Sequence, residues 1–210
     1  METFWSDIVD AYAAELASLA DAGCSYVQID ETAFAKFSDP EVQRTLAERG
    51  EDWQDVIDLY IEITNRVLAR APKGLRIGMH LCRGNRGGHF HAEGSYDIVA
   101  EKLFNALNIP FYFMEYDSPR AGDFTPLRFV PPEKSVILGL VSTKSQQLET
   151  RDDLKRRIEE ASKYVDAEHL AISPQCGFAS VASGNPITPD MQEAKLSLVV
   201  EVANEVWPDA

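Results

Sequence analysis

Residue types that bind transition metals recur where apolar segments of the sequence end. His80 and Cys82 close the run "RIGMHLC", Glu115 closes "FYFME", and Cys176 follows "AISPQ". Such apolar runs predict buried strands, and the active sites of parallel α/β proteins lie at the carboxyl ends of their strands. Two thiolates, an imidazole and a carboxylate are a ligand set that suits Zn²⁺. From the residues alone two interpretations stay open, a zinc site and ordinary burial of these side chains.

The spacing along each strand indicates which side chains can share a face. His80 and Cys82 lie two residues apart, so an extended chain points both to the same side. Asp30 and Glu31 are adjacent and must point to opposite sides, so only one of them can face a site. A carboxylate at that position is a natural partner for a substrate ammonium group. Cys24 lies at the start of its strand, and we interpret it as a core residue.

A glycine-rich segment, residues 82–95, follows the first of these strand ends. It contains neither of the glycine patterns that bind nucleotide phosphates. Two interpretations remain for it. One is a mobile surface loop, and the other is a lid in which Arg83 and Arg86 bind carboxylates of a substrate.

The elements that position these residues alternate along the chain. Five apolar runs separated by amphipathic segments predict repeated βα units and a parallel sheet, either doubly wound or a (β/α)8 barrel. Their near-continuous apolar composition is typical of strands covered on both faces. No linker divides residues 1–210, so we expect a single domain. The expected strands are 24–30, 74–82, 110–117, 135–143 and 169–177, and the expected helices are 5–22, two within 40–70, 95–107, 150–165 and 188–207, with Ser95, Thr150 and Thr188 as caps.

Composition restricts the class of partner and the compartment. The net charge of −14 over 210 residues argues against nucleic acid and anionic membrane surfaces as partners. No apolar stretch is long enough to cross a membrane, and the first residues do not form a signal peptide. Three widely spaced cysteines without an export signal argue against a disulfide framework, so we expect a cytoplasmic protein.

Five stretches of the sequence together resemble one known family, the cobalamin-independent methionine synthases. The likeness is to their C-terminal catalytic zinc barrel and, more closely, to the shorter single-barrel members. The fold that it implies is α/β, of the (β/α)8 TIM-barrel type, with only about the last five βα units present in this chain. The stretches are "YVQIDETAFAKFSDP", "GMHLCRGN", "YFMEYDSPRAGDF", "LGLVSTKS" and "SPQCGFAS".

The resemblance also implies a reaction and a role for individual residues. The family's zinc ligands fall on His80, Cys82, Glu115 and Cys176, and the aspartate that holds the amino group of homocysteine falls on Asp30. The implied reaction moves a methyl group from 5-methyltetrahydrofolate, or its polyglutamate, to the thiol of homocysteine and forms methionine. Zinc would be the cofactor, and the two small molecules would be the substrates.

Two substitutions depart from the family pattern. Lys144 stands where the family has its proton-donating histidine, and Lys36 stands where the long enzymes have an acid that contacts the folate. Both changes put the folate in question more than the zinc or the thiol. The alternatives are therefore alkyl transfer to a thiol from another donor, such as a methylcorrinoid, and a non-catalytic fragment or subunit.

The strand count is a third departure, because about three βα units of the barrel are not found. An open arc of five strands would expose two sheet edges and part of a core. A shortened chain, a truncated gene, a partner chain or self-association would each account for this.

Overall fold

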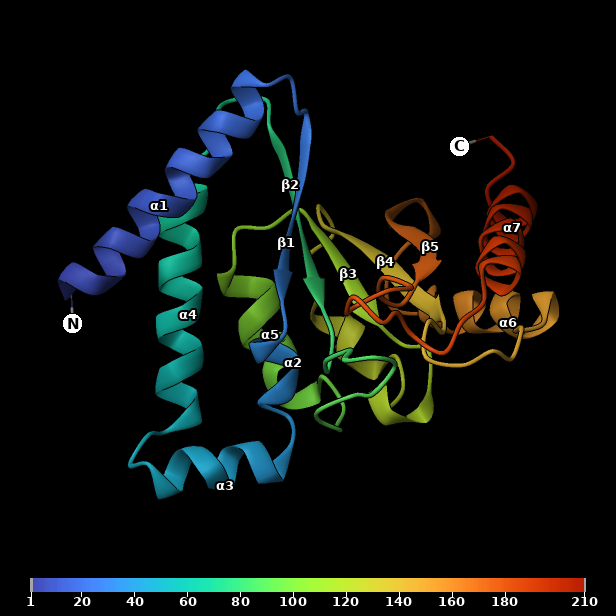
Figure 1. Cartoon of the computed structure of the whole chain (residues 1–210), viewed down its shortest axis with the longest axis horizontal. Helices are drawn as coiled ribbons and strands as arrows, with labels where there is room; N and C mark the ends of the chain where they lie inside the picture. Colours follow the sequence, from blue (N-terminus) through green and yellow to red (C-terminus); the bar gives the residue numbers. More distant parts are fainter. Residues whose placement is uncertain (1, 210) are drawn as a thin grey trace.

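A five-stranded parallel sheet, ordered β1-β2-β3-β4-β5, forms the centre of the computed structural model, which describes residues 2–209 (Figure 1). This confirms the five predicted strands and the α/β class, and the arrangement is a partial TIM barrel. The strands are β1 (Tyr26–Glu31), β2 (Arg76–Leu81), β3 (Phe111–Glu115), β4 (Ser135–Val141) and β5 (Leu170–Pro174).

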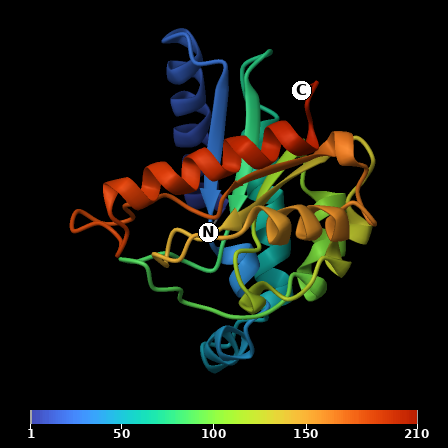
Figure 2. The same ribbon diagram turned by 90° about the vertical axis from the view of Figure 1, so that its right-hand side faces the viewer.

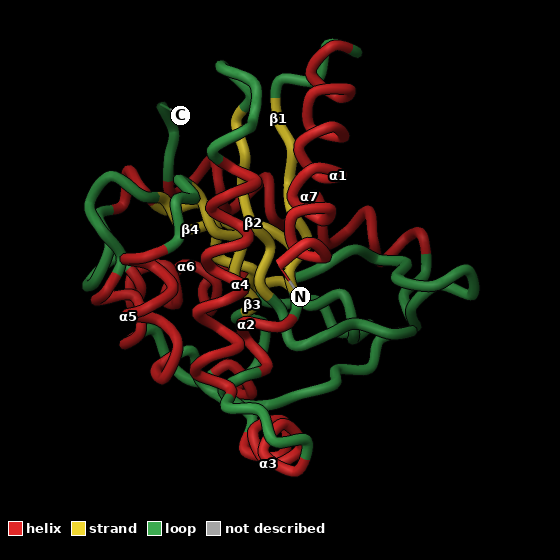
Figure 3. The backbone as a smooth tube through the Cα atoms, turned by 90° about the vertical axis from the view of Figure 1, so that its left-hand side faces the viewer, coloured by secondary structure: helices red, strands yellow, loops and turns green. Residues whose placement is uncertain are grey.

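Helices follow the strands in the expected alternation. The long helices are α1 (Glu2–Asp21), α4 (Trp53–Leu68), α5 (Asp97–Ala106), α6 (Arg151–Ala161) and α7 (Pro189–Val206), and the shorter ones are α2 (Ala33–Lys36) and α3 (Pro40–Glu48). Helices α1 and α4 pack against each other beside β1, whereas α3 lies away from the sheet (Figure 3). Helices α6 and α7 are neighbours at the opposite end of the sheet, beside β5 (Figure 2).

Two of the three predicted helix caps are confirmed, and the caps Asp39 of α3 and Asp52 of α4 were not predicted. Thr150 and Thr188 accept hydrogen bonds from the N–H groups of Asp153 and Met191, as the sequence predicts. The prediction for Ser95 is off by one residue, because α5 begins at Asp97 with Tyr96 in the cap position. The Ser95 hydroxyl still accepts a hydrogen bond from the Asp97 N–H at 3.2 Å.

The two faces of the sheet differ in cover. One face packs under the helices and carries fully buried side chains such as Met79, Tyr112 and Leu138. Neighbouring side chains on the other face, among them Gln28 and Phe113, are half-buried or exposed and line an open cavity. The expectation of cover on both faces is therefore wrong for this inner face. In a closed barrel the inner side chains pack against strands from the opposite wall, and the described residues provide no such wall.

The outer strands leave the sheet open at both sides. Within residues 2–209, β1 pairs only with β2, and β5 pairs only with β4.

None of the described helices combines the length and the apolar character needed to cross a bilayer. The cytoplasmic location stays a prediction.

Candidate metal and thiol site

Three of the predicted ligands meet at the carboxyl ends of β2 and β5. One ligand atom each from His80, Cys82 and Cys176 lies within 4.8 Å of the other two. The Sγ atom of Cys176 is 3.4 Å from Nε2 of His80. His80 and Cys176 are 96 residues apart in the chain. No other group of three such ligand atoms was found among residues 2–209.

Strand geometry explains why these side chains converge. His80 is in register with Asp30 on β1 and with Phe113 on β3, so all three share the inner face. Cys82 follows β2 directly and keeps that direction. Cys176 comes two residues after the end of β5, where the backbone still bonds to β4 through the Gln175 N–H and the Val141 carbonyl, at 2.8 Å.

A glycine in β4 permits this approach of β5. A Cβ atom added to Gly139 would lie 2.7 Å from the carbonyl oxygen of Met114 and 3.0 Å from Cα of Gln175. Both neighbours are backbone atoms, which cannot shift without moving the main chain itself. The pairing of β4 with β5 is also irregular between Gly139 and Val141. A larger residue at this position would therefore displace the segment that leads into Cys176.

An open cavity of about 620 Å³ lies over the three ligands. Asp30 faces it from β1, with its Oδ1 atom 4.0 Å from Nε2 of His80 and its side chain 75% exposed. Glu31 points the other way and accepts hydrogen bonds from the N–H groups of Ala33 and Phe34 at 2.8 and 2.7 Å. Of the two adjacent acids, Asp30 is thus the one that faces the cavity and Glu31 is the one that starts α2.

The neighbours of Cys82 favour its deprotonated form, the thiolate. A hydrogen bond from the Cys176 thiol, together with the neighbouring His80, lowers the pKa of Cys82 to about 5 in spite of burial. The same hydrogen bond and burial raise the pKa of Cys176. Burial alone would lower the pKa of His80, but its hydrogen bond to Cys82 and the nearby acids outweigh burial and raise it. One thiolate beside an imidazole is an electron-rich arrangement that suits a cation.

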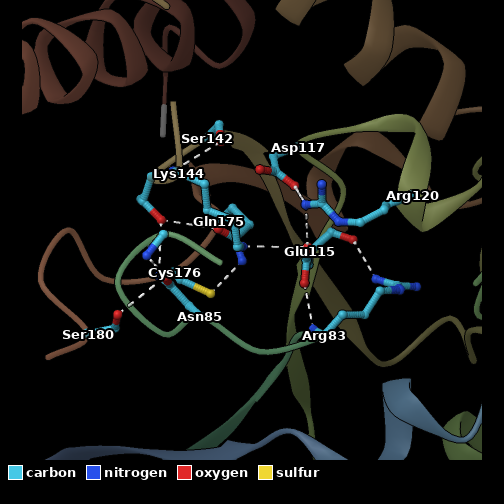
Figure 4. A network of polar contacts seen from close by, with 12 residues as sticks. Arg83, Asn85, Glu115, Asp117, Arg120, Ser142, Lys144, Gln175, Cys176 and Ser180 are labelled. Carbon is cyan, nitrogen blue, oxygen red and sulfur yellow. Dashed lines mark hydrogen bonds and ion pairs between the residues drawn. The ribbon is translucent and has the colours of Figure 1, made fainter. Parts of the chain in front are cut away.

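Glu115 lies at the neighbouring strand end but does not join the three ligands. Its Oε2 atom accepts the Arg83 N–H at 2.6 Å, and its Oε1 atom is 3.0 Å from Nη2 of Arg120 and 3.6 Å from Nζ of Lys144 (Figure 4). Burial raises the pKa of Glu115, yet Lys144, the Arg83 N–H and Arg120 together bring it below its usual value. This fully buried carboxylate is therefore charged, and it is already held by two hydrogen-bond donors and by the neighbouring ammonium group of Lys144.

Lys144 and the two loop arginines take up different places. The side chain of Lys144 is only 7% exposed, and its nearest acid is Glu115. Arg83 is completely buried, donates to the carbonyl of Gly94 and stacks on the ring of Tyr96. The interpretation of Arg83 as a substrate-binding residue of a lid is therefore wrong. Arg86 is exposed, and for this residue the interpretation stays a prediction.

Sequence reasoning missed two side chains that contact the predicted residues. Gln175 is buried and donates its amide N–H to the sulfur of Cys176, while Thr143 donates to its amide oxygen at 3.1 Å. Arg120 is the main side-chain partner of Glu115. Adjacency to Cys176 could have pointed to Gln175, but no local pattern marks Arg120.

A family model described as "Cobalamin-independent synthase, Catalytic domain" matches residues 1–205. The uncharacterized proteins YxjG and YxjH of Bacillus subtilis are 43% and 40% identical to this chain over 207 residues, which cover 98% of it and 55% of each relative. A methionine synthase of Pyrococcus abyssi is 26% identical, over 84% of this chain and 44% of its own length.

Two solved structures are also similar to this chain. The putative vitamin-B12-independent methionine synthase of Listeria monocytogenes aligns with 98% of this chain and 56% of its own, at 32% identity and a TM-score of 0.73. A B12-independent methionine synthase from a Shewanella strain, solved in complex with selenomethionine, shares the fold with a TM-score of 0.73 at 22% identity. The chain spans about half the length of these proteins.

Proposed function

Because the chain belongs to the catalytic-domain family of the cobalamin-independent synthases, we propose that it transfers a methyl group to the thiol of homocysteine and forms methionine. The observation that carries this proposal is the meeting of His80, Cys82 and Cys176 in one cavity, with Asp30 on the adjacent strand β1. The activity of the whole protein is part of the proposal, because the chain corresponds to little more than half of its relatives.

The donor atoms in the cavity fit zinc. Zn²⁺ favours sulfur and nitrogen ligands, and the clustered atoms of His80, Cys82 and Cys176 offer two sulfurs and one imidazole nitrogen. We propose these three as ligands and Glu115, at the adjacent strand end, as the fourth. When bound, zinc supplies a Lewis acid that lowers the pKa of a coordinated substrate thiol, so that a nucleophilic thiolate exists at neutral pH.

The chain's own residues have two further tasks in this proposal. Asp30 binds the ammonium group of homocysteine, which fixes the end of the substrate opposite its thiol. Lys144 provides the proton that the nitrogen of the methyl donor needs in order to leave. Its ammonium group is buried beside Glu115, one strand away from the thiol cavity.

The identity of the methyl donor is a separate part of the proposal. We propose 5-methyltetrahydrofolate or its polyglutamate, from the family. Lys144 and Lys36 replace residues that serve the folate in the long enzymes, and this difference favours testing a second donor class, a methylcorrinoid. Selenomethionine bound by the Shewanella relative is an analogue of the proposed product, and so supports the thiol half of the reaction.

The test is methionine formation by zinc-loaded protein from homocysteine and one donor at a time. We expect labelled methionine by mass spectrometry with methylated folate. Product from the methylcorrinoid alone would replace the donor and keep the thiol chemistry. No product from either donor, with the missing barrel units supplied as a second polypeptide, would favour a non-catalytic subunit.

Two further parts of the proposal concern the surroundings of the protein. A polypeptide that carries the remaining barrel strands, or a second copy of this chain, would cover the open edges at β1 and β5. Free thiols at the site suit a reducing compartment, so we also propose a cytoplasmic location.

A further inference from the structure

The segment after Cys176 has an unusual means of support. Strand β5 ends at Pro174, and the last main-chain bond to β4 is made by the Gln175 N–H. Within the described chain, no main-chain hydrogen bond joins residues 176–180 to another main-chain group. A metal ligand in such a segment needs other contacts to hold its position.

Two asparagine side chains make those contacts, and both end on the same atom. Nδ2 of Asn85, in the loop after β2, donates to the carbonyl oxygen of Gly177 at 3.2 Å. Nδ2 of Asn185 donates to that oxygen at 3.2 Å and to the carbonyl of Thr143 at 3.1 Å. Because Gly177 directly follows Cys176, these bonds fix the peptide group between Gly177 and Phe178, one residue beyond the cysteine.

The orientation of both amides is determined by their partners. A carbonyl oxygen can only accept, so the atom that faces Gly177 must be the amide nitrogen in each case. The opposite atom of Asn85 accepts the Gly88 N–H at 3.2 Å, and that of Asn185 accepts the Ser180 hydroxyl at 2.9 Å. Aspartate at either position would place an oxygen against the Gly177 carbonyl. Asparagine, whose amide has one donor and one acceptor atom, therefore suits both position 85 and position 185.

Close packing of the two loops adds to the bridge. The Gly87 N–H donates to the Ser180 hydroxyl at 3.0 Å, and Gly88, at φ +86°, leaves no room for a side chain because an added Cβ would lie 2.6 Å from Cδ of Pro186. The loop that follows His80 and Cys82 is therefore joined to the loop that follows Cys176 (Figure 4 shows Asn85, Cys176 and Ser180 together).

We infer that Asn85 and Asn185 are positioning residues that hold Cys176 beside His80 and Cys82 and so complete the metal site. This inference rests on the zinc site proposed above and adds to it two residues outside the ligand set. Partners of this kind, which orient a ligand without touching the metal, change metal affinity by about 10- to 100-fold when they are removed.

The experiment measures zinc affinity by competition with a chelator in the full 210-residue chain and in the variants Asn185→Ala and Asn85→Ala. We expect zinc to bind about 10- to 100-fold more weakly in each variant. Thermal unfolding of the metal-free proteins should change little, since Asn85 and Asn185 lie near the surface of the loops. Cobalt-loaded protein should show a weaker thiolate charge-transfer band in both variants.

The matched control is Asn105→Ala. Asn105 lies in α5 and donates only to the Glu101 carbonyl of the same helix, so its removal should leave zinc affinity at the parent value. If either alanine variant fails to fold, Asn185→Asp keeps the size of the side chain and replaces the donor by a charged oxygen that the Gly177 and Thr143 carbonyls repel, and it should show at least the same loss of zinc affinity.

The outcomes separate this inference from the function beneath it. A parent chain that holds zinc, with Asn85 and Asn185 variants within twofold of its affinity, overturns the positioning role and leaves the proposed function standing. A parent chain that retains no zinc overturns the proposed function and this inference with it.

Discussion

At the scale of single residues, the charge of each site group is determined by the groups that contact it. Cys82 is next to the Cys176 thiol and His80, which favour its thiolate. Glu115 is surrounded by Arg120, Lys144 and the Arg83 N–H, which hold it as a carboxylate. The two charged groups lie at adjacent strand ends, and this is where substitutions report most directly on function.

Serine in place of Cys82 or Cys176 should abolish retention of zinc during dialysis. A serine hydroxyl stays protonated at neutral pH and is a poor zinc ligand, so two donors would be left in the cavity. Zinc per chain, measured by atomic absorption, is the readout. Cys24→Ser is the control, because Cys24 bonds to the carbonyl of Tyr26 at the far end of β1. Full zinc content in both site variants would contradict the ligand assignment.

Asparagine in place of Asp30 should weaken homocysteine binding and leave zinc content unchanged. The variant loses a charged hydrogen bond to the substrate ammonium group. Since the side chain is 75% exposed, water screens the interaction and the loss should be ~1 kcal/mol, or about fivefold in Kd by calorimetry. Loss of the metal in this variant would assign Asp30 to the metal instead of the substrate.

Glutamine in place of Glu115 should reduce the stability of the metal-free protein by about 3 kcal/mol, because Arg120 and Lys144 would keep their charges in a buried place without the carboxylate. Urea unfolding measures this loss. An unchanged midpoint would mean that these cations find other partners, and that the carboxylate is free to serve the metal alone.

At the scale of elements, local pattern predicted nearly all that the sheet needs. The five strands and the five long helices follow from apolar periodicity and from caps such as Thr150 and Thr188, which act within one turn. The short helix α2 was not predicted, because its start depends on Glu31 bonding to the N–H groups that follow it. The bridge from Asn85 to Gly177 was also missed, since no spacing along the chain relates two loops that meet only in the fold.

Removal of one cap tests this local part of the fold. Alanine in place of Thr150 should lower stability by about 1 kcal/mol, because the Asp153 N–H at the start of α6 loses its acceptor. Thermal unfolding is the measurement. Thr45→Ala is the control within α3, where alanine improves helix propensity and no cap is lost. Equal losses in both variants would show that the cap has no special part.

At the scale of the whole molecule, the main features are the open inner face and the outer edges of β1 and β5, which pair with no further strand within residues 2–209. Both lie in the part of the fold where a TIM barrel closes on itself, and the relatives have nearly twice the chain length. Half-buried groups such as Phe113, and the exposed side chains Leu196 and Val200 of α7, provide apolar surface for additional strands and helices.

A second polypeptide with the part of YxjG that this chain does not match should bind here. We expect a one-to-one complex by light scattering and a higher unfolding temperature for the mixture, because burial of the inner face and pairing of both edges stabilise the sheet. Methionine formation should appear or increase in the complex. A chain that stays unbound in the mixture, and forms a defined dimer alone, would favour self-association.

The sequence by itself determined the parallel α/β class, the family, and the strand ends that carry His80, Cys82, Glu115 and Cys176, because apolar periodicity and motif spacing are properties of neighbouring residues. Only the tertiary structure decided which of those four meet. His80, Cys82 and Cys176 converge because the sheet from β2 to β5 brings the ends of these two strands to one cavity. Glu115 is instead held by Arg120, Lys144 and Arg83, a competition among side chains from separate elements that no local pattern contains.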